Sequence, residues 1–449
     1  MGRRTSLAGL AMAGALTVAS VGASAAVEAL HGRPGSGNRT TARTLPTRWI
    51  NTWVSMPQLT ETNNLPPAPF TGTDSVLVDS TLRQTVHTTV GGGQMRLRFS
   101  NAFGGADLPI TKAAVALPLG GKAGVSAVLP GTSRPVTFRG RASTVVPVGA
   151  QVVSDPLAFD VAADSDITVT MYLAKGQSST NVTSHPGSRT TSYMVTGDHV
   201  ADNDLSGAAS VAHWYFLSGL EVWSPGGTGV LAVLGDSLTD GRGSTTDRNN
   251  RWPDVLSDRL RARTDLPPIA VLNQAAGGNR VLHDGLGPNA LARLDRDVLV
   301  QSGVDRMIVF EGVNDIGTAP ATSADQRQVA ADLVDAYDQI VRRAHTLGIR
   351  VYGATLLPFG GNSGYDDPSG YRRSARNTVN TWIRSSGRFD AVLDFDRVVR
   401  DPDDAEQLRS SYGDGDGLHL NPTGYEALAG AVPPQLFQPS SLPADFGFN

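Results

Sequence analysis

The spacing of hydrophobic residues changes once along the chain. From Trp49 to about Trp223, short runs of β-branched and apolar residues alternate with Gly, Pro, Asn and Asp, which is typical of strands joined by turns. Beyond the segment WSPGGTG, residues 223–229, apolar strand-like runs alternate with segments of helical periodicity. We therefore expect an all-β domain over residues 49–225 and an α/β domain over residues 226–449.

The N-terminal domain is predicted to be a β-sandwich or jelly roll. Helical periodicity is nearly absent from it, and turn residues recur between its apolar runs. The stretches that we interpret as strand-forming are 75–90, 94–103, 113–119, 134–140, 150–161 and 166–174.

The C-terminal domain is predicted to be a parallel sheet covered by helices on both faces, since strands and helices alternate along it. The predicted strands are 230–235, 269–274, 306–311, 350–357 and 391–395. The predicted helices are 252–263, 290–301, 324–347, 370–385 and 422–436. In sheets of this kind ligands bind outside the carboxyl ends of the strands, so polar groups at those ends are candidates for a site.

Polar and glycine-rich segments follow the first three of these strands, and another lies near the C-terminus. They are GDSLTDG (235–241), NQAAGGNR (273–280), EGVNDIG (311–317) and DGDGLHLNPTGY (414–425). Gly-Asp-Ser by itself is ordinary turn sequence, and Ser237 alone would as readily cap the next helix. The later segments change this interpretation, because the topology of the sheet brings them to the same edge as Ser237.

A serine hydroxyl becomes a strong nucleophile when a neutral imidazole takes its proton and a carboxylate holds the other ring nitrogen. For Ser237, we predict that His419 and Asp416 have these two roles, because residues three apart in a helical turn lie on one side of it. Asp414 is the alternative carboxylate.

Attack on an ester carbonyl creates an oxyanion, which fixed hydrogen-bond donors stabilise. The candidate donors are the backbone N–H groups of Ser237 and Gly278 and the side-chain amide of Asn314. Glycine at position 278 permits the close backbone approach that such a donor needs. Asn279 and Arg280 are weaker candidates for binding substrate, since they would as readily tie the loop to its neighbours.

Together, the four segments resemble the signature blocks of the SGNH or GDSL hydrolase family. The four residues that name the family are here Ser237, Gly278, Asn314 and His419. In that family the aspartate three residues before the histidine completes a catalytic triad, which favours Asp416. The resemblance covers about residues 229–436, and it implies a flavodoxin-like sheet in a three-layer α/β/α fold and ester hydrolysis through an acyl-enzyme.

Two segments of the β-domain extend the resemblance. Residues 81–105, TLRQTVHTTVGGGQMRLRFSNAFGG, and 184–193, SHPGSRTTSY, are similar to the domain that precedes the hydrolase in a secreted microbial branch related to xylan-cluster esterases. This favours a carbohydrate substrate bearing short acyl groups, acetyl above all. The alternatives are a lipase-type or phospholipase-type acyl hydrolase or acyltransferase on lipids, and a glycan-binding protein with a vestigial hydrolase domain. The β-domain itself would anchor substrate or form a pocket wall.

The first residues predict export. Residues 1–25, MGRRTSLAGLAMAGALTVASVGASA, carry Arg3 and Arg4, then a small apolar stretch, and end in the Ala-x-Ala form of a signal-peptidase site. We therefore predict a signal peptide over 1–25, a flexible lead-in over 26–48 and a secreted, extracellular protein. No later segment reaches the roughly 18 apolar residues that a membrane-spanning helix needs.

Composition narrows the possible partners. The chain is 40% hydrophobic and 18% charged, and its net charge of −4 comes from interspersed signs, so no basic stripe for nucleic acid is visible. It has no cysteine, its eight histidines show no metal-ligand spacing such as H-E-x-x-H, and no phosphate-binding glycine loop joins a strand to a helix. We expect a small-molecule or polysaccharide ester as partner, with no nucleic acid, no metal and no cofactor.

Overall fold

The computed structural model describes residues 46–438, which belong to one compact unit. The predicted signal peptide, and the predicted lead-in up to residue 45, lie outside the described residues. The first strand, β1, begins at Arg48, inside the range predicted as lead-in. Among residues 46–438, no helix is both long and apolar enough to cross a membrane. The predicted domain limits stay a prediction.

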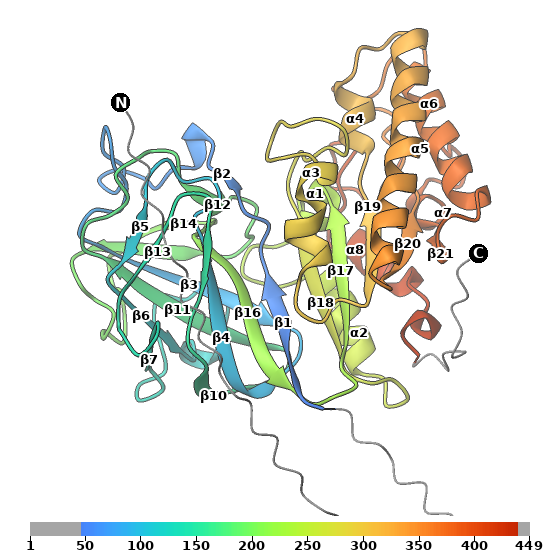
Figure 1. Ribbon diagram of the computed structural model, residues 1–449. Coiled ribbons are helices and arrows are strands. Elements are labelled where there is room, and N and C mark those ends of the chain that lie inside the picture. Colours follow the sequence, from blue (N-terminus) through green and yellow to red (C-terminus); the bar gives the residue numbers. More distant parts are fainter. Residues whose placement is uncertain (1–45, 439–449) are drawn as a thin grey trace, which may run out of the picture. The chain divides into compact units, whose positions relative to one another are not determined.

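The N-terminal region consists of antiparallel sheets, which confirms the predicted all-β architecture (Figure 1). Its strands are β1 (Arg48–Val54), β2 (Gln58–Leu59), β3 (Ser80–Thr88), β4 (Gly92–Ser100), β5 (Leu108–Ile110), β6 (Lys112–Ala116), β7 (Arg134–Val136), β8 (Thr144–Val146), β9 (Gln151–Val153), β10 (Leu157–Val161), β11 (Ser165–Leu173), β12 (Thr183–His185), β13 (Ser192–Thr196), β14 (Ala209–Val211), β15 (Trp214–Tyr215) and β16 (Leu217–Ser224). The two large sheets have the orders β1-β16-β4-β10, with β9 paired to β4, and β14-β13-β3-β11-β6-β7. Two small sheets, β15-β12-β2 and β5-β8, complete the region.

The C-terminal region contains a five-stranded parallel sheet with the order β18-β17-β19-β20-β21. Its strands are β17 (Gly229–Gly235), β18 (Ile269–Ala275), β19 (Arg306–Phe310), β20 (Arg350–Ala354) and β21 (Ala391–Leu393). This is the flavodoxin-like order, so the predicted fold is confirmed. Every residue of β17 is buried, as expected for a parallel strand that is covered on both faces.

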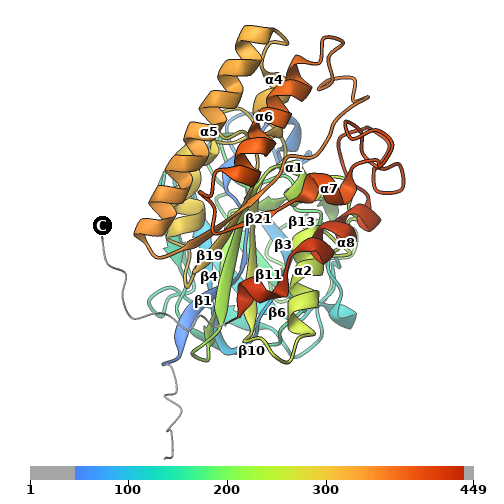
Figure 2. The same cartoon turned by 90° about the vertical axis from the view of Figure 1, so that its right-hand side faces the viewer.

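Helices cover both faces of the parallel sheet. They are α1 (Ser237–Asp240), α2 (Trp252–Arg261), α3 (Ala290–Leu294), α4 (Val313–Thr318), α5 (Ser323–Thr346), α6 (Tyr371–Ser385), α7 (Phe395–Val399) and α8 (Pro422–Ala431), with a π-helical turn η3 (Asp295–Leu299) and a 3-10 turn η4 (Pro434–Phe437). Two further 3-10 turns, η1 (Thr62–Asn64) and η2 (Leu119–Gly121), belong to the N-terminal region. Helices α2, α7 and α8 pack together, and α5 packs on α6. Figure 2 shows these two groups on opposite sides of the strands, which gives the three predicted layers.

Some element ends differ from the predicted ones because side chains take over the backbone hydrogen bonds. β20 ends at Ala354 rather than at residue 357, since the Asn380 amide accepts from the Leu356 N–H and donates to its carbonyl, at 2.7 and 2.8 Å. α8 ends at Ala431, because Pro433 and Pro434 lack the N–H that a helix needs. The short helices α1, α4 and α7 span too few residues to show a hydrophobic period.

The N-terminal region covers one edge of the parallel sheet. β18 is an edge strand, and β1 packs against it. Thr89, just after β3, accepts a hydrogen bond from the Val271 N–H of β18 at 3.2 Å. Asn51 of β1 exchanges hydrogen bonds with the backbone of Ser302, at 3.1 and 2.8 Å. An unpaired strand edge promotes aggregation, so these contacts protect this edge of the parallel sheet.

Candidate active site

Ser237 lies at the carboxyl end of β17, as the first residue of α1. Asp236 caps this helix, because its side chain accepts a hydrogen bond from the Leu238 N–H at 2.9 Å. The capping role that the Gly-Asp-Ser sequence allowed for the serine therefore belongs to its neighbour. The Ser237 Oγ instead lies 2.9 Å from His419 Nε2.

Asp416 and His419 lie in the loop before α8, and not in the helical turn that we predicted. Side-chain to backbone bonds shape this loop, because Asp416 Oδ1 accepts the N–H groups of Leu418 and His419, each at 2.8 Å. Asp416 Oδ2 lies 2.6 Å from His419 Nδ1. Asp414 accepts the Asp416 N–H at 3.1 Å, so the imidazole is paired with Asp416.

Hydrogen bonds keep Asp416 ionised. Partial burial would raise its pKa, but the bonds from the His419 ring and from the backbone of His419 and Leu418 outweigh burial and hold the pKa well below its ordinary value. Burial and the adjacent Asp416 carboxylate raise the pKa of Asp414. A carboxylate that stays negative beside Nδ1 favours the imidazole tautomer whose Nε2 can accept the serine proton.

The predicted oxyanion donors line the cavity that contains the Ser237–His419 pair. Gly278 has a φ of +73°, a left-handed conformation that favours glycine. Asn314 lies in α4 and is only 3% exposed. Its Nδ2 donates one hydrogen bond to the Asn279 carbonyl at 2.7 Å, and the second N–H of the amide remains for a ligand.

Tyr365 orients the Asn314 amide, and sequence reasoning did not identify it. The Tyr365 hydroxyl donates to Asn314 Oδ1 at 2.6 Å and also lines the cavity. Burial, helped by the charge of Asp236, raises the pKa of Tyr365 to about 12, so the hydroxyl keeps the proton that it donates. The residue lies in the loop between β20 and α6, where a single tyrosine carries no recognisable sequence signal.

Asn279 and Arg280 make contacts that tie the loop to its neighbours. Asn279 Nδ2 donates to two carbonyls of the following loop at 3.0 and 2.9 Å, and its Oδ1 accepts from Arg293 at 2.8 Å. Arg280 donates to the Thr318 hydroxyl at 3.3 Å. Neither residue lines the cavity at Ser237. Their predicted role in substrate binding stays a prediction, and these contacts favour the loop-tying alternative.

A buried charged pair lies beneath the strand ends. Arg293 and Glu311 are each about 1% exposed, and Arg293 Nη2 lies 3.3 Å from Glu311 Oε2. Burial raises the pKa of Glu311 to about 7, although the charge of Arg293 and its hydrogen bond act to lower that pKa. Since Arg293 also donates to the Gln274 carbonyl at 2.6 Å, the pair links the ends of β18 and β19.

The cavity at Ser237 has a volume of about 470 Å³ and is lined by two parts of the chain. One wall comes from the C-terminal region and includes the predicted nucleophile, base and oxyanion donors. The other wall comes from the N-terminal region and consists of Gln58, Glu61, Asn64, Pro186, Gly187 and Arg189. We refer to these six residues as the β-wall. Its side chains are mostly polar, and Glu61 accepts hydrogen bonds from both Gln58 and Asn64.

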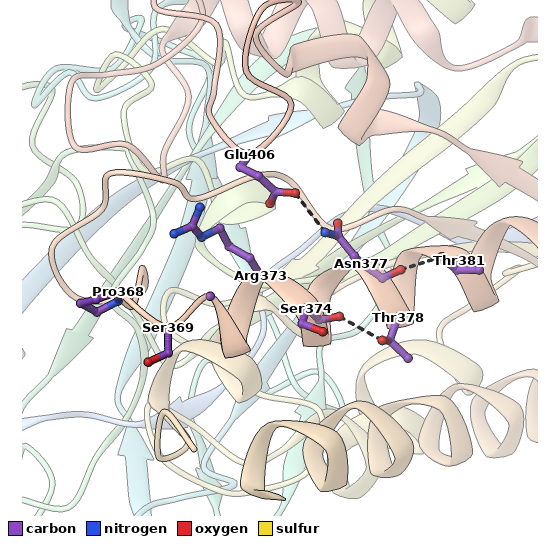
Figure 3. A pocket seen from close by; sticks show the side chains of 9 residues that line it. Pro368, Ser369, Arg373, Ser374, Asn377, Thr378, Thr381 and Glu406 are labelled. Atoms are coloured by element: carbon purple, nitrogen blue, oxygen red, sulfur yellow. Dashed lines mark hydrogen bonds between the residues drawn. The ribbon is translucent and has the colours of Figure 1, made fainter. Parts of the chain in front are cut away.

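A larger hollow of about 770 Å³ runs along α6 (Figure 3). Its lining includes Ser374 and Asn377, and Asn377 donates to Glu406 at 3.0 Å. No histidine is among its lining residues, so its serines have no imidazole beside them to take a proton. We therefore place the chemistry in the smaller cavity.

Asp414, Asp416 and His419 also have ligand atoms within 4.8 Å of one another, an arrangement open to a metal ion. Both aspartates are exposed, and the ring nitrogen that faces them, His419 Nδ1, is the one bonded to Asp416. Asp416 bonds to the imidazole and Asp414 to the Asp416 N–H, and these hydrogen bonds explain why the three groups lie close together.

The similarity to a known protein family lies in the C-terminal region. Residues 233–427 match the model of the GDSL-like lipase/acylhydrolase family. No curated protein matches the chain. The chain is similar to solved structures of the acetylxylan esterase Axe2 from Geobacillus stearothermophilus, in a catalytic mutant form (19% identity, TM-score 0.35, 45% of this chain and 91% of that chain). It is also similar to a GDSL-like lipase from Bacteroides thetaiotaomicron VPI-5482 (14% identity, TM-score 0.33, 45% of this chain and 85% of that chain). A third similar structure is LAE5, an α/β hydrolase from the metagenome of Lake Arreo, Spain (18% identity, TM-score 0.34, 45% of this chain and 92% of that chain).

Proposed function

From the premise that residues 233–427 are a carboxylic ester hydrolase domain of the GDSL-like lipase/acylhydrolase family, we propose that the protein is a serine esterase acting on carbohydrate esters. We further propose that it removes short acyl groups, acetyl above all. The observation that carries the proposal is the hydrogen-bonded series Ser237, His419 and Asp416 in a cavity with a polar wall.

In the first half of the proposed reaction, His419 Nε2 takes the proton from Ser237 Oγ while Oγ bonds to the ester carbonyl carbon. The negative charge that develops on the carbonyl oxygen is met by the N–H groups of Ser237 and Gly278 and by the Asn314 amide. The ester C–O bond then breaks, and the alcohol leaves with the proton from Nε2. The acyl group stays on Ser237.

In the second half, a water molecule replaces the alcohol. His419 Nε2 takes a proton from the water as its oxygen bonds to the acyl carbon, and the same donors meet the second oxyanion. Collapse of this intermediate returns the proton to Ser237 Oγ and releases the carboxylic acid. Asp416 holds the imidazole in one tautomer and stabilises its positive charge through both halves.

The lining of the cavity supports a polar alcohol portion and a short acyl group. Gln58, Glu61 and Asn64 of the β-wall offer hydrogen-bonding groups that match sugar hydroxyls. The large apolar side chains that line the cavity are those of Leu286 and Leu418, in addition to the ring of Pro186. These suit an acetyl group better than a long hydrocarbon chain, which would need a longer apolar groove.

A panel of p-nitrophenyl esters from acetate to palmitate, measured beside acetylated xylan, tests the proposal. We expect kcat/KM to be highest for acetate and acetate to be released from the xylan. Ser237→Ala should abolish both activities while leaving the fold intact, and a fluorophosphonate probe should label Ser237 alone. A preference for palmitate with no release from xylan would replace the carbohydrate substrate with a lipid.

Two further parts of the proposal have their own measurements. We propose that the protein works outside the cell, on the basis of residues 1–25, so protein recovered from the medium should begin near Ala26. We also propose catalysis without a metal ion. Activity should then persist in EDTA, and a loss that added metal restores would assign the group of Asp414, Asp416 and His419 to a cation instead.

A further inference from the structure

We infer that His185 of the N-terminal region is a positioning residue for the oxyanion donors and acts through Asp240. This inference rests on the proposed function and deepens it, because it assigns the N-terminal region a part in the chemical step. His185 ends strand β12, and Asp240 is the last residue of α1, the helix that begins with Ser237. The two residues are 4% and 2% exposed.

Asp240 joins two segments of the active site to the N-terminal region. Its Oδ1 lies 2.9 Å from His185 Nε2, and its Oδ2 accepts the Gly277 N–H at 2.9 Å. Gly277 immediately precedes Gly278, whose N–H is a proposed oxyanion donor. Since Ser237 starts the helix that Asp240 ends, one carboxylate connects the segments that carry two of the three donors.

The imidazole of His185 is itself held from the other side. Its Nδ1 lies 3.0 Å from the Met56 carbonyl oxygen, and the Trp214 ring stacks on it with centroids 5.8 Å apart. A carbonyl oxygen can only accept, so Nδ1 carries a proton. The bond to Asp240 needs a second proton, held either by Nε2 or by the carboxyl group. In both forms the carboxyl group keeps its bond to the Gly277 N–H.

Position matters here because oxyanion donors act only at short range. They must lie about 2.7–3.1 Å from the developing charge, and a displacement of about 1 Å far from the reacting atoms can cost 100-fold in rate. Without His185, the buried Asp240 carboxyl would lose one of its two fixed partners. We expect the loop of Gly277 and Gly278 to shift relative to Ser237 as a result.

Gly187 provides an independent way to disturb the same carboxyl group. A Cβ at this position would lie 1.8 Å from Asp240 Oδ2, so a side chain there must push the carboxyl group away. Gly187→Ala keeps the His185 side chain in the protein. It should therefore reproduce the kinetic effect of removing the imidazole if the position of Asp240 is what matters.

The experiment compares His185→Ala, His185→Gln and Gly187→Ala in the full-length protein with p-nitrophenyl acetate as substrate. We expect kcat to fall by about 10- to 100-fold in His185→Ala and Gly187→Ala, with KM changed by less than about threefold, because the loss concerns the transition state. The Gln side chain can place an N–H donor where Nε2 lies, so His185→Gln should recover much of kcat. The rate at which a fluorophosphonate labels Ser237 should fall in parallel, since that reaction uses the same donors.

His199→Ala is the control. His199 is also a histidine of the N-terminal region paired with an aspartate, its Nδ1 lying 2.7 Å from Asp202, but its side chain is partly exposed and lines neither the cavity at Ser237 nor the small cavity beside His185 and Asp240. It should leave kcat and the labelling rate unchanged. Unfolding midpoints of all variants identify any that fail to fold, and Gly187→Ala then decides the question if His185→Ala is among them.

The inference is overturned if His185→Ala or a folded Gly187→Ala keeps the wild-type kcat. A rise in KM with kcat unchanged would also overturn it, and would show that His185 only supports the β-wall. Equal losses of kcat in His185→Ala and His185→Gln, with the His199→Ala control impaired to the same extent, would also overturn it. Failure of the proposed function is distinguishable, because Ser237→Ala would then remain active.

Discussion

At the scale of single residues, two neighbouring aspartates differ in environment and hence in role. Asp416 bonds to the imidazole and Asp414 to the Asp416 backbone. Asp416→Asn should favour the wrong imidazole tautomer and lower kcat by about 100- to 10,000-fold. The Asp416 side chain is 35% exposed, and access of water to it would bring the loss towards the smaller figure. Asp414→Asn should lower kcat far less. Steady-state kinetics of both variants checks this, and equal losses would contradict the assignment.

Asn314 and Tyr365 should differ in the size of their effects. Asn314→Ala removes an oxyanion donor, which should cost about 100- to 1,000-fold in kcat, or roughly 2.7–4 kcal/mol, with KM little changed. Tyr365→Phe keeps the amide but removes the bond at Oδ1 that orients it, so we expect a smaller loss of about tenfold. If Asn314→Ala raised KM alone, the residue would bind the substrate rather than the oxyanion.

Glu311 should make stability depend on pH. Burial raises its pKa to about 7 in the folded protein, from an ordinary value of 4.5. Between these values the folded carboxyl group holds a proton that the unfolded chain has released. The free energy of unfolding attributable to Glu311 is therefore greatest below pH 4.5 and should fall as pH rises towards 7, by about 3 kcal/mol. Urea unfolding across this range should give a shallower slope for Glu311→Gln, and equal slopes would contradict the prediction.

At the scale of secondary-structure elements, α2 is anchored by its first residue. Trp252 is fully buried, its ring lies 5.5 Å from that of Phe395 in α7, and its Nε1 donates to Thr239 of α1 at 3.1 Å. The tryptophan therefore packs α2 against α1 and α7 and does not line the cavity at Ser237.

The stability of variants tests this packing role. Trp252→Ala should lower the free energy of unfolding by about 3–5 kcal/mol, because it leaves a large cavity that the surrounding side chains cannot fill. Trp223→Ala is the comparison, since that ring on β16 is 38% exposed and its loss should cost much less. Denaturant titration of both variants measures the difference, and similar costs would show that Trp252 is not a core residue.

At the scale of the whole molecule, the N-terminal region contacts the C-terminal region along strand β18 and through the His185–Asp240 pair. It also contributes the β-wall to the cavity at Ser237. The hydrophobic core is also continuous, since Ile50 of β1 and Val230 of β17 belong to one buried cluster. Removing the N-terminal region would expose apolar surface and a strand edge.

A chain that starts near Gly226 should therefore be poorly soluble and slow on both p-nitrophenyl acetate and acetylated xylan. The full-length protein, measured at equal concentration, is the reference. If the N-terminal region only anchored the polymer, the shortened chain would keep its rate on the small ester and lose it on xylan alone. A soluble shortened chain with full activity on both substrates would contradict any role in the site.

The sequence by itself determined what local patterns can encode. The change of hydrophobic period predicted the two classes of sheet, and the parallel topology predicted that Ser237, Gly278, Asn314 and His419 meet at one edge. The unbroken apolar run of β17 agrees with its burial on both faces, whereas the structure gave the cap of α1 to Asp236 rather than to Ser237. Predictions of this kind depend on short-range spacing, and short-range spacing is visible in one sequence.

Only the tertiary structure decided which distant residues support the site. Tyr365 meets Asn314 across 51 positions and His185 meets Asp240 across 55, and no period or motif encodes such a pair. The family resemblance had favoured Asp416 over Asp414, but only the structure showed that Asp416 meets the imidazole through a loop shaped by side-chain to backbone bonds and not through a helical turn. Such contacts form only when separate elements pack together, and the packing brings side chains into hydrogen-bonding range regardless of their separation along the chain.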